Sequence, residues 1–481
     1  MPSDREPFVV VGGDAAGLSA ASKCKREDPD REVVVYEKGS WVSYAHCGTP
    51  YFVKGEVDEL TDLLSLSPAE VDERGIELCR NHEVLDVDTE ARTVSVAGPD
   101  GEFEQPYGDL LVATGAHALT SPVDGTDLVG VHTLHGLDAA AGIRAHLLDP
   151  DTDHLADVGG EAFVDRERVE RYGAMDPPET VAIVGGGYVG IEMAEAFSTH
   201  QCDVHLFQRG AHVLPPFGEA VAERVEAELR EQGVRLHLET EVAELTGGEG
   251  RVEHLVCTGG TELDTELALV GVGIHPNTEL VANEPVETGP GGAIVVDDHG
   301  WTGVERVYAA GDCATMEHAV TGEQDWVPLG LTANRAGRAI GSTVAGDPEP
   351  VGTIAGTGVL KAFDCEAGRT GIIDPDRARE AGFDPVSETV TAGSRSGYYP
   401  GGSATGVTLV ADWDSGLLLG GSIVGTDRAA IRVDILATAI EQGATVGELE
   451  RTDLAYAPPF SPVWDPVLVA AKVLRGSIEE G

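Results

Sequence analysis

The stretch Phe8-Val-Val-Val-Gly-Gly-Asp-Ala-Ala-Gly-Leu-Ser-Ala-Ala-Ser-Lys-Cys-Lys-Arg26 decides the fold of this 481-residue chain. Its β-branched run over 8–11 predicts a strand, the small residues that follow predict a tight turn, and residues 18–26 predict a helix. A second strand is predicted over 31–36, directly before Glu37. This order is typical of a unit that binds a dinucleotide, in which the helix N-terminus faces the pyrophosphate and the later carboxylate accepts the ribose hydroxyls.

The glycine turn of this unit departs from the G-x-G-x-x-G pattern, because Asp14 stands at the second glycine position. Gly12 would permit the tight turn, and Gly17 would let helix and strand pack closely. One imperfect motif is weakly specific, so a glycine turn in another α/β fold is the alternative. The residues predicted to contact a cofactor here are Gly12, Asp14, Ala15, Ala16, Gly17, Glu37 and Lys38.

The same pattern returns at residues 181–207, where an apolar run precedes the complete motif Gly185-Gly-Gly-Tyr-Val-Gly190. Two such units in one chain are more specific than either alone, and they predict two dinucleotide sites. A duplicated fold with one inactive site is the alternative. The predicted contacts of the second site are Gly185, Gly187, Tyr188, Val189, Gly190, Glu192, Gln208 and Arg209.

Three further strand ends contribute to the predicted cofactor sites. Residues 109–116 and 269–277 each indicate a strand that runs into a turn of small residues, and residues 307–313 indicate a strand that delivers Asp312. An acid at such a strand end could hold the ribityl chain of a flavin. The predicted contacts at these ends are Thr114, Gly115, Gly273, Gly311 and Asp312.

Charge limits the partners that the chain can bind. Lys plus Arg number 32 and Asp plus Glu number 83, so the net charge is −51, and only six residues are lysine. Phosphates would meet no basic patch and anionic membranes would repel the surface, so neither nucleic acid nor a membrane is expected as a partner. An acidic, lysine-poor composition is typical of cytoplasmic proteins of halophilic organisms, where ionic strength screens self-repulsion.

Targeting and metal binding leave no clear pattern in the sequence. No apolar run approaches about 18 residues, and the N-terminus lacks the features of a signal peptide, so a cytoplasmic protein without a membrane span is expected. The seven cysteines include no C-x-x-C pair and no zinc spacing. Reduced thiols and no metal site are therefore predicted.

With these motifs in place, the chain resembles the flavin- and pyridine-nucleotide-dependent disulfide oxidoreductases over nearly its full length. The resemblance implies an α/β fold with two three-layer dinucleotide-binding domains, followed by a C-terminal α+β domain that forms a homodimer. It assigns FAD to residues 1–120 and 289–345, NAD(P)H to residues 121–288, and the dimer interface to residues 346–481. Residues 149–180 are acidic and long for this position, which predicts a solvated surface insertion with a helical turn over 166–171; a partner site is the alternative.

Residues 43–51, Ser-Tyr-Ala-His-Cys-Gly-Thr-Pro-Tyr, carry the predicted reactive centre. Most disulfide reductases of this kind have two cysteines here, whereas this chain has Cys47 alone. The single-cysteine pattern resembles the coenzyme A disulfide reductases, with NADH oxidases and peroxidases as near relatives. A thiolate that reacts beside a flavin without a second cysteine must form its mixed disulfide with the substrate. The other six cysteines are interpreted as small buried hydrophobes.

Two further features separate the branches of the family. Oxidases and peroxidases usually carry a histidine where this chain has Ala15, so oxygen chemistry is less favoured. The segments around Tyr398 and Tyr456 resemble coenzyme A reductase motifs, in which these tyrosines reach across the dimer to the partner's cysteine. Their phenols could assist a leaving thiolate, although two core tyrosines would give the same pattern.

The resemblance also implies substrate contacts at Lys23, Arg26 and Ser43, of which the two cations would bind coenzyme A phosphates. Ordinary helix-surface charge is the alternative for these cations. His46 stands where the family usually has asparagine. An imidazole next to Cys47 could help to form the thiolate or select a different thiol, and it is therefore treated as a catalytic candidate.

The choice of nicotinamide nucleotide depends on Gln208 and Arg209. A carboxylate at this strand end would repel a 2′-phosphate, whereas a neutral glutamine followed by arginine favours NADPH over NADH. Glu192 resembles the family's glutamate near the nicotinamide. It could instead stabilise the start of its helix.

The sequence therefore predicts an FAD-dependent NAD(P)H:disulfide reductase that resembles the coenzyme A disulfide reductases. Its substrate would be coenzyme A disulfide or a related disulfide or persulfide of a small thiol, reduced through a mixed disulfide at Cys47. One alternative keeps the fold and reduces oxygen through a Cys47 sulfenate, as an NAD(P)H oxidase. Another is a flavoprotein electron carrier that serves a protein acceptor.

Overall fold

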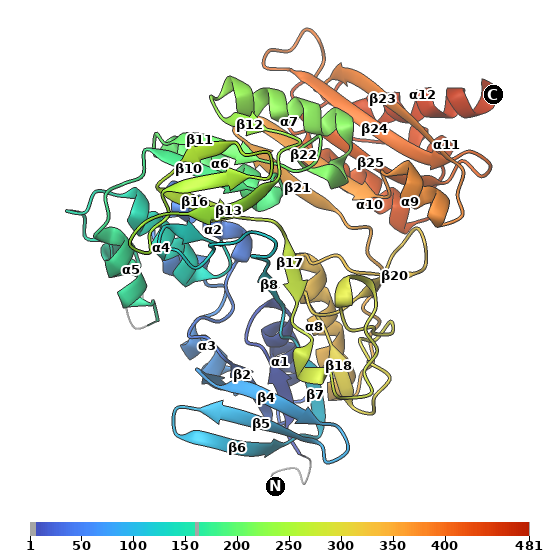
Figure 1. Ribbon diagram of the computed structural model, residues 1–481. Helices are drawn as coiled ribbons and strands as arrows, with labels where there is room; N and C mark the ends of the chain where they lie inside the picture. The colour runs from blue at the N-terminus through green and yellow to red at the C-terminus, as the bar shows by residue number, and fades with distance from the viewer. Residues whose placement is uncertain (1–5, 159–162, 481) are drawn as a thin grey trace.

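The computed structural model describes residues 6–158 and 163–480 (Figure 1). Two α/β regions and a C-terminal sheet with its helices make up the described part of the molecule. The predicted fold class is confirmed, because each of the first two regions is built on a parallel sheet and the third on an antiparallel one.

The first sheet is built around β1 (Phe8–Val11), whose four residues are all buried. The strand order is β18-β7-β1-β2-β3, and every pairing is parallel. A parallel strand covered on both faces needs a continuous apolar run, which is what the sequence of β1 supplies. The other strands are β2 (Val33–Glu37), β3 (Glu77–Arg80), β7 (Asp109–Val112) and β18 (Val307–Ala309).

Helices α1 (Ala15–Glu27) and α8 (Gly330–Ala345) pack against each other on one face of this sheet. A Cβ atom at Gly337 would lie 2.2 Å from the Ala16 carbonyl oxygen, so only glycine permits this approach. α1 begins three residues before the predicted helix, because the small residues of the turn form its first turn. The opposite face is covered by β4 (Glu83–Asp88), β5 (Thr93–Gly98) and β6 (Gly101–Pro106).

The second sheet repeats this plan in the order β12-β11-β10-β16-β9, again with parallel pairs throughout. Helix α6 follows β10 after the second glycine turn, as α1 follows β1 after the first. The elements are β9 (Val131–His132), α4 (Leu137–Leu147), β10 (Thr180–Val184), α6 (Tyr188–Thr199), β11 (Asp203–Phe207), α7 (Glu219–Glu231), β12 (Arg235–His237), β13 (Val242–Thr246), β14 (His254–Cys257), β15 (Glu262–Asp264) and β16 (Leu267–Val270).

The prediction of a solvated insertion over 149–180 is only partly right, because residues 149–153 are exposed whereas the segment around residues 166–173 packs into the core. Helix α5 (Arg166–Gly173) confirms the predicted helical turn, but it packs against α4, and Val169 and Tyr172 are buried in the same core as the second sheet. These two residues are three apart and share one face of the helix. The acidic composition concealed this apolar face. Residues 159–162 of the predicted insertion lie outside the described residues.

Two pairs of short strands lie outside the large sheets. The two α/β regions are linked by the antiparallel pair β8 (Ala116–Ala118) and β17 (Ile274–Pro276), while β19 (Met316–Glu317) and β20 (Gln324–Asp325) form a small ribbon after β18. None of the helices in residues 6–158 and 163–480 combines the length and apolar character that crossing a bilayer requires.

The C-terminal region is a five-stranded antiparallel sheet in the order β21-β22-β25-β24-β23. Helix α12 (Pro466–Glu480) lies along β23 and β24 and closes the core of this region (Figure 1). The remaining elements are β21 (Gly358–Ala362), β22 (Cys365–Gly371), α9 (Pro375–Glu380), β23 (Pro385–Gly393), β24 (Ala404–Asp412), β25 (Leu418–Gly425), α10 (Val433–Glu441) and α11 (Val446–Glu450).

Candidate active site

The first glycine turn packs its backbone closely against neighbouring segments of the chain. Gly12 has φ +112°, and a Cβ there would lie 2.1 Å from the Ala113 carbonyl oxygen. A Cβ at Gly17 would lie 1.9 Å from the Gly12 carbonyl oxygen, so both positions exclude larger residues. The N-terminus of α1 therefore opens directly at the turn, as a pyrophosphate site requires.

Glu37 ends β2 beside this turn and is held in a fixed position. Gly13 N–H donates to its Oε2 atom at 2.8 Å, and Gly39 N–H donates to its Oε1 atom at 2.7 Å. Burial raises the pKa of the Glu37 carboxyl, while the two backbone donors oppose that shift. A carboxylate at this strand end fits the role of a ribose hydroxyl acceptor.

The second glycine turn repeats the arrangement of the first with a neutral side chain. Gly185 also has φ +112°, and a Cβ at Gly190 would lie 2.0 Å from the Gly185 carbonyl oxygen. Gly186 N–H donates to Gln208 Oε1 at 3.1 Å, as Gly13 N–H donates to Glu37. Gln208 therefore takes the acceptor position without a charge. Arg209, the next residue, is exposed.

The other predicted cofactor residues lie at strand ends near the turns. Thr114 Oγ1 donates to the Asn277 carbonyl oxygen at 2.6 Å, and Asn277 N–H donates to the Gly115 carbonyl oxygen at 2.9 Å. Gly273 has φ +126° and sits between β16 and β17. The end of the second α/β region is thereby tied to the end of β7.

Asp312 follows β18 and lies among other charged groups of the first glycine turn. Burial raises the pKa of its carboxyl, the Asp14 carboxylate raises it further, and the nearby His46 opposes the shift. Gly311 has φ +85°, and a Cβ there would lie 3.2 Å from the Cβ of Ala16. The fold therefore brings the end of β18, the glycine turn and the cysteine segment together, as the sequence predicted for a flavin site.

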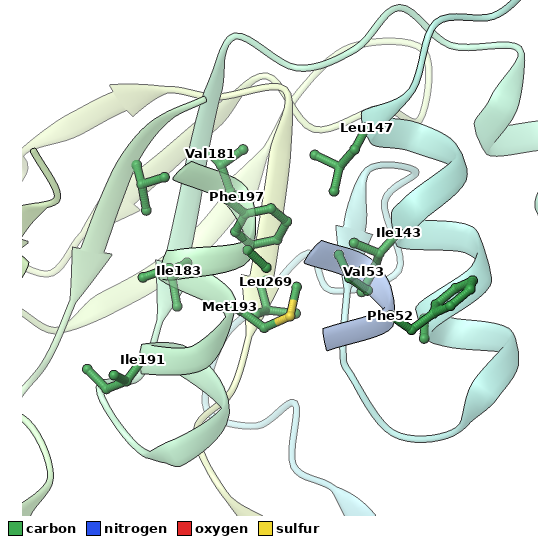
Figure 2. Close-up of a cluster of buried hydrophobic side chains, with 14 of the residues drawn as sticks. Phe52, Val53, Ile143, Leu147, Val181, Ile183, Ile191, Met193, Phe197 and Leu269 are labelled. Atoms are coloured by element: carbon green, nitrogen blue, oxygen red, sulfur yellow. The ribbon is translucent and has the colours of Figure 1, made fainter. Parts of the chain in front are cut away.

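Cys47 lies in a short 3-10 turn, residues His46–Gly48, directly before α2 (Thr49–Lys54). Figure 2 shows Phe52 and Val53 of α2 in the same apolar cluster as side chains of α4 and α6, which anchors the cysteine segment to the second α/β region. Cys47 is the only exposed residue among the seven cysteines, none of which forms a disulfide. Partial desolvation, followed by the carboxylates of Glu192 and Asp312, raises the pKa of its thiol.

Glu192 and Tyr51 form a polar pair near Cys47. The Tyr51 hydroxyl donates to Glu192 Oε1 at 3.2 Å. Burial raises the pKa of Glu192 to about 7, with the Tyr51 hydrogen bond acting against the shift. Tyr51 closes the S-x-x-x-C-G-x-P-Y pattern around the cysteine, but the sequence alone predicted no role for it. A carboxyl that titrates near neutrality can exchange a proton during turnover.

His46 faces the glycine turn. Its Nε2 atom pairs with Asp14 Oδ2, and its ring lies over Tyr44 with centroids 4.2 Å apart. A second imidazole, His135, lies 5.8 Å away between centroids. Among the contacts of the described residues, the imidazole has these partners and none with the Cys47 thiol, so its predicted catalytic role stays a prediction.

The three predicted substrate contacts lie on or near α1. Lys23 is half-buried and pairs with Glu27 on the next turn, whereas Arg26 is exposed. Ser43 is buried, and its N–H donates to the Gly13 carbonyl oxygen at 3.0 Å. Ser43 thereby ties the cysteine segment to the glycine turn through its backbone.

Tyr398 and Tyr456 belong to the C-terminal region and share one exposed surface. They are 76% and 49% exposed, so the alternative of two core tyrosines does not apply. Tyr398 lies within hydrogen-bond reach of the Tyr456 phenol and raises its pKa. The two tyrosines of the prediction are therefore brought together, on a surface that nothing in this chain covers among the described residues.

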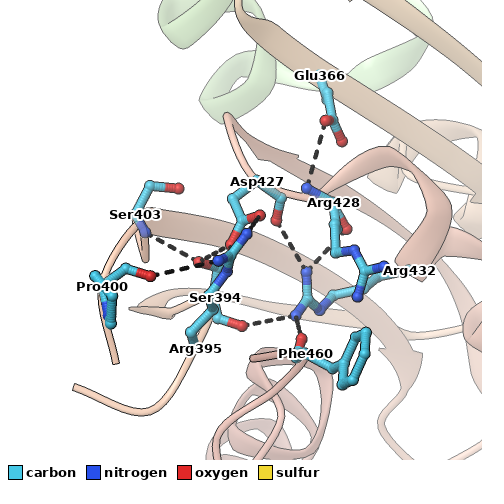
Figure 3. Close-up of polar contacts among 9 residues, drawn as sticks. All are labelled: Glu366, Ser394, Arg395, Pro400, Ser403, Asp427, Arg428, Arg432 and Phe460. Carbon is cyan, nitrogen blue, oxygen red and sulfur yellow. Dashed lines mark hydrogen bonds and ion pairs between the residues drawn. The ribbon is translucent and has the colours of Figure 1, made fainter. Parts of the chain in front are cut away.

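A buried ionic network holds the loops that carry these tyrosines (Figure 3). Arg432 donates to the Ser394 carbonyl oxygen at 2.8 Å and to the Phe460 carbonyl oxygen at 3.3 Å. Its Nε atom also pairs with Asp465 at 3.0 Å. One guanidinium therefore joins the loop before Tyr398 to the segment after Tyr456.

Comparison with known proteins identifies relatives over the whole chain. Residues 6–325 match the pyridine nucleotide-disulphide oxidoreductase family, and residues 359–466 match the dimerisation domain of that family. The chain is 39% identical over 474 residues to the NAD(P)H coenzyme A polysulfide/persulfide reductase of Pyrococcus horikoshii, an alignment that covers 98% of this chain and 99% of that protein. It is 30% identical over 467 residues to the NADH oxidase of Methanocaldococcus jannaschii, covering 96% and 97%.

A solved structure shows the same arrangement. The NAD-dependent persulfide reductase of A. fulgidus aligns with a TM-score of 0.89 and 31% identity, over 98% of this chain and 84% of that one. The coenzyme A disulfide reductase of Staphylococcus haemolyticus is a more distant relative, 27% identical over 459 residues and covering 94% and 96% of the two chains. Relatives of this chain therefore include reductases of both disulfides and persulfides.

Proposed function

Because this chain belongs to the pyridine nucleotide-disulphide oxidoreductase family, which implies FAD and NAD(P)H as its cofactors, we propose that it reduces a disulfide or persulfide of coenzyme A, or of a related small thiol, through Cys47. The observation that carries this proposal is the position of Cys47. It is the one exposed cysteine of the chain, beside the first glycine turn, with no second thiol to resolve a disulfide.

The sulfur chemistry follows from having a single cysteine. The Cys47 thiolate attacks one sulfur of the substrate disulfide, the S–S bond breaks, and the other half leaves as a thiolate that takes a proton. Two electrons from NAD(P)H then cleave the bond between Cys47 and the retained thiol, which returns the Cys47 thiolate and releases the second thiol. A persulfide substrate gives one thiol and hydrogen sulfide by the same balance.

The residues of the first α/β region fit FAD. The glycine turn before α1 would hold the pyrophosphate, Glu37 the ribose and Asp312 the ribityl chain, with the domain assigned to residues 1–120 and 289–345. Bound FAD supplies the two-electron relay between the nicotinamide and the sulfur. The Cβ clashes at Gly12 and Gly17 support this assignment, because the tight turn and the close helix packing of a dinucleotide-binding unit require glycine at these two positions.

The residues of the second region, 121–288, fit NAD(P)H, and NADPH is the proposed preference. Gln208 occupies the acceptor position that Glu37 has in the first region, and it brings no negative charge against a 2′-phosphate. The exposed guanidinium of Arg209 adds a positive charge at the same strand end.

Proton transfer is proposed for Glu192 and for the pair Tyr398 and Tyr456. Glu192, with a pKa of about 7, can hold a proton near Cys47 at neutral pH. In a homodimer formed by residues 346–481, Tyr398 and Tyr456 of one subunit would approach Cys47 of the other and donate to the leaving thiolate. Their exposure together on one surface supports this arrangement.

The oxidase named among the relatives makes oxygen a second candidate acceptor. Against it, Ala15 provides no acid–base group in the glycine turn. The deciding experiment measures oxidation of NADPH and NADH by the purified holoprotein in high KCl. The anaerobic reactions contain coenzyme A disulfide or coenzyme A persulfide, and a third reaction without either substrate is run in air. Rapid turnover with a sulfur substrate and slow turnover in air is expected, whereas turnover in air alone would establish an oxidase.

Cys47→Ser tests the mechanism in the same assay. Loss of the nucleophile is expected to lower sulfur reduction by about three orders of magnitude or more. The matched control is Cys79→Ser, which changes a half-buried cysteine on β3 and is expected to leave the rate unchanged. Undiminished disulfide reduction by the Cys47→Ser protein would reject the proposed mechanism.

A further inference from the structure

We infer that Asp14 and His46 form a charge-compensated pair that allows a carboxylate to stand in the phosphate turn of the FAD site, which makes His46 a positioning residue for the flavin rather than the base of Cys47. The inference rests on the proposed FAD site in the first α/β region. It concerns two residues that the family motif does not explain.

Asp14 directs both carboxylate oxygens away from its own helix. It is the N-cap residue of α1, yet its side chain accepts no hydrogen bond from the first turn of that helix. Instead, Tyr44 N–H donates to Oδ1 at 3.1 Å, and His46 Nε2 pairs with Oδ2. Both oxygens are therefore engaged by the cysteine segment, which places the segment and the turn in a fixed relation.

Electrostatics requires a counter-charge at this place. The pyrophosphate of FAD brings negative charge to the N-terminus of α1, and an unpaired carboxylate one residue before that helix would repel it. The first turn of α1 contains no basic residue that could offset Asp14. Glu37 and Asp312 add two more carboxylates to the surroundings of His46. An imidazolium at His46 offsets part of this charge.

The surroundings of His46 favour its protonated form. Desolvation lowers its pKa, but the hydrogen bond and charge of Asp14, together with Asp312 and Glu37, outweigh that effect and raise it overall. The pKa of the neighbouring His135 is lowered instead, by burial and by the charge of His46. The remaining neighbours are the uncharged Tyr44 and, beyond His135, the cation Lys38. These opposite shifts favour the protonated form of His46 and the neutral form of His135.

The geometry argues against His46 as the base of Cys47. Nε2 is occupied by Asp14, and the groups that act on the Cys47 pKa, after desolvation, are the carboxylates of Glu192 and Asp312, which disfavour the thiolate. A histidine that activates a cysteine stabilises its thiolate by charge and hydrogen bonding. The engaged Nε2 atom leaves the imidazole directed at the turn.

A double-mutant cycle on flavin retention tests the pair. Holoprotein is prepared as the wild type and as His46→Asn, Asp14→Asn and the double variant, and the FAD dissociation constant is measured from flavin fluorescence at fixed KCl between pH 6 and 9. His46→Asn is expected to weaken FAD binding at least tenfold at pH 6.5, because Asp14 is left uncompensated. Asp14→Asn and the double variant are expected to bind FAD within threefold of the wild type, which also shows that the substitutions are tolerated by the fold.

The pH dependence and a neighbouring histidine give further readouts. Wild-type affinity for FAD is expected to fall as the pH rises through the titration of His46, and the double variant is expected to lose this dependence. His135→Asn removes the uncharged imidazole of the same cluster and is the matched control, with no expected change in affinity. The alkylation rate of Cys47 by iodoacetamide, measured against pH, reports separately on the thiol.

Three results would overturn the inference. One is equal FAD affinity in all variants; another is a His46→Asn defect that persists in the double variant. The third is a large fall in Cys47 alkylation with unchanged flavin affinity, which would instead establish His46 as the base. A wild-type protein that binds no FAD would reject the proposed function as well, so the two failures are distinguishable.

Discussion

The Tyr51 hydroxyl donates a hydrogen bond to Glu192 Oε1 over 3.2 Å and so joins the cysteine segment of the first α/β region to helix α6 of the second. Tyr51 and Glu192 are 141 residues apart in the chain. Glu192, whose pKa is about 7, also raises the pKa of the Cys47 thiol. Protonation of one carboxyl on α6 is therefore coupled to the reactivity of a thiol on the other region.

Glu192→Gln is expected to make Cys47 more reactive in the resting protein. The substitution removes a negative charge that disfavours the thiolate, so alkylation of Cys47 by iodoacetamide at pH 7.5 should become severalfold faster. Glu56→Gln, which changes an exposed carboxylate paired with Lys54, is the control and should leave the rate unchanged. An unchanged rate in Glu192→Gln would show that the two groups are not coupled.

Gln208→Glu is expected to reverse the nucleotide preference. The new carboxylate can accept the same Gly186 N–H, but it places a negative charge where NADPH carries its 2′-phosphate. The ratio of kcat/KM for NADPH to that for NADH should fall by about tenfold or more, that is about 1.4 kcal/mol. Arg209→Gln should lower the same ratio by removing the counter-charge. A wild-type enzyme that already prefers NADH would contradict the assignment before any variant is made.

Features set by local sequence were predictable, whereas contacts between distant segments were not. Glu37 and Gln208 lie where their motifs predicted, because a strand, a glycine turn and a helix fix the position of a strand-end residue within one local unit. The contact between Asp14 and His46 joins residues 32 apart, and no local pattern specifies it. The burial of α5 was hidden for a related reason, since acidic composition describes its exposed face and two apolar residues form the other.

Arg432→Met is expected to destabilise the C-terminal region and to loosen the tyrosine surface. The guanidinium is buried and is bonded to Asp465 and to the carbonyl oxygens of Ser394 and Phe460. Removing one partner of a buried pair leaves the other charge uncompensated, at a cost of about 3–5 kcal/mol.

The measurements for Arg432→Met are the urea midpoint and the sedimentation coefficient in high KCl. The urea midpoint should fall. The dimer should dissociate at a higher protein concentration than the wild type does, because the network holds the loops of the proposed interface. The double change Arg432→Met with Asp465→Leu removes both charges and should recover part of the stability. A single variant with the wild-type midpoint and an unaltered dimer would show that the network does not support this surface.

Acid should destabilise the second α/β region through two buried histidines. His132 Nε2 lies 3.5 Å from His146 Nδ1, and both rings contact Tyr172. Burial lowers the pKa of His146 to about 4 and that of His132 well below its ordinary value. The folded protein therefore keeps both rings neutral, whereas the unfolded chain binds protons below about pH 6.5.

The sign of the effect follows from proton uptake on unfolding. Since the unfolded state binds more protons, the free energy of unfolding should fall as the pH drops from 6.5 towards 4, by up to about 1.4 kcal/mol per pH unit for each histidine. Urea unfolding of the holoprotein at pH 7.5, 6 and 5 in constant KCl measures this slope. His146→Leu removes one titrating group and should flatten it, whereas His254→Asn, which changes an exposed histidine, should not. An unaltered slope in His146→Leu would assign the acid sensitivity to other groups, of which His318, with a pKa lowered by burial to about 4, is the next to test.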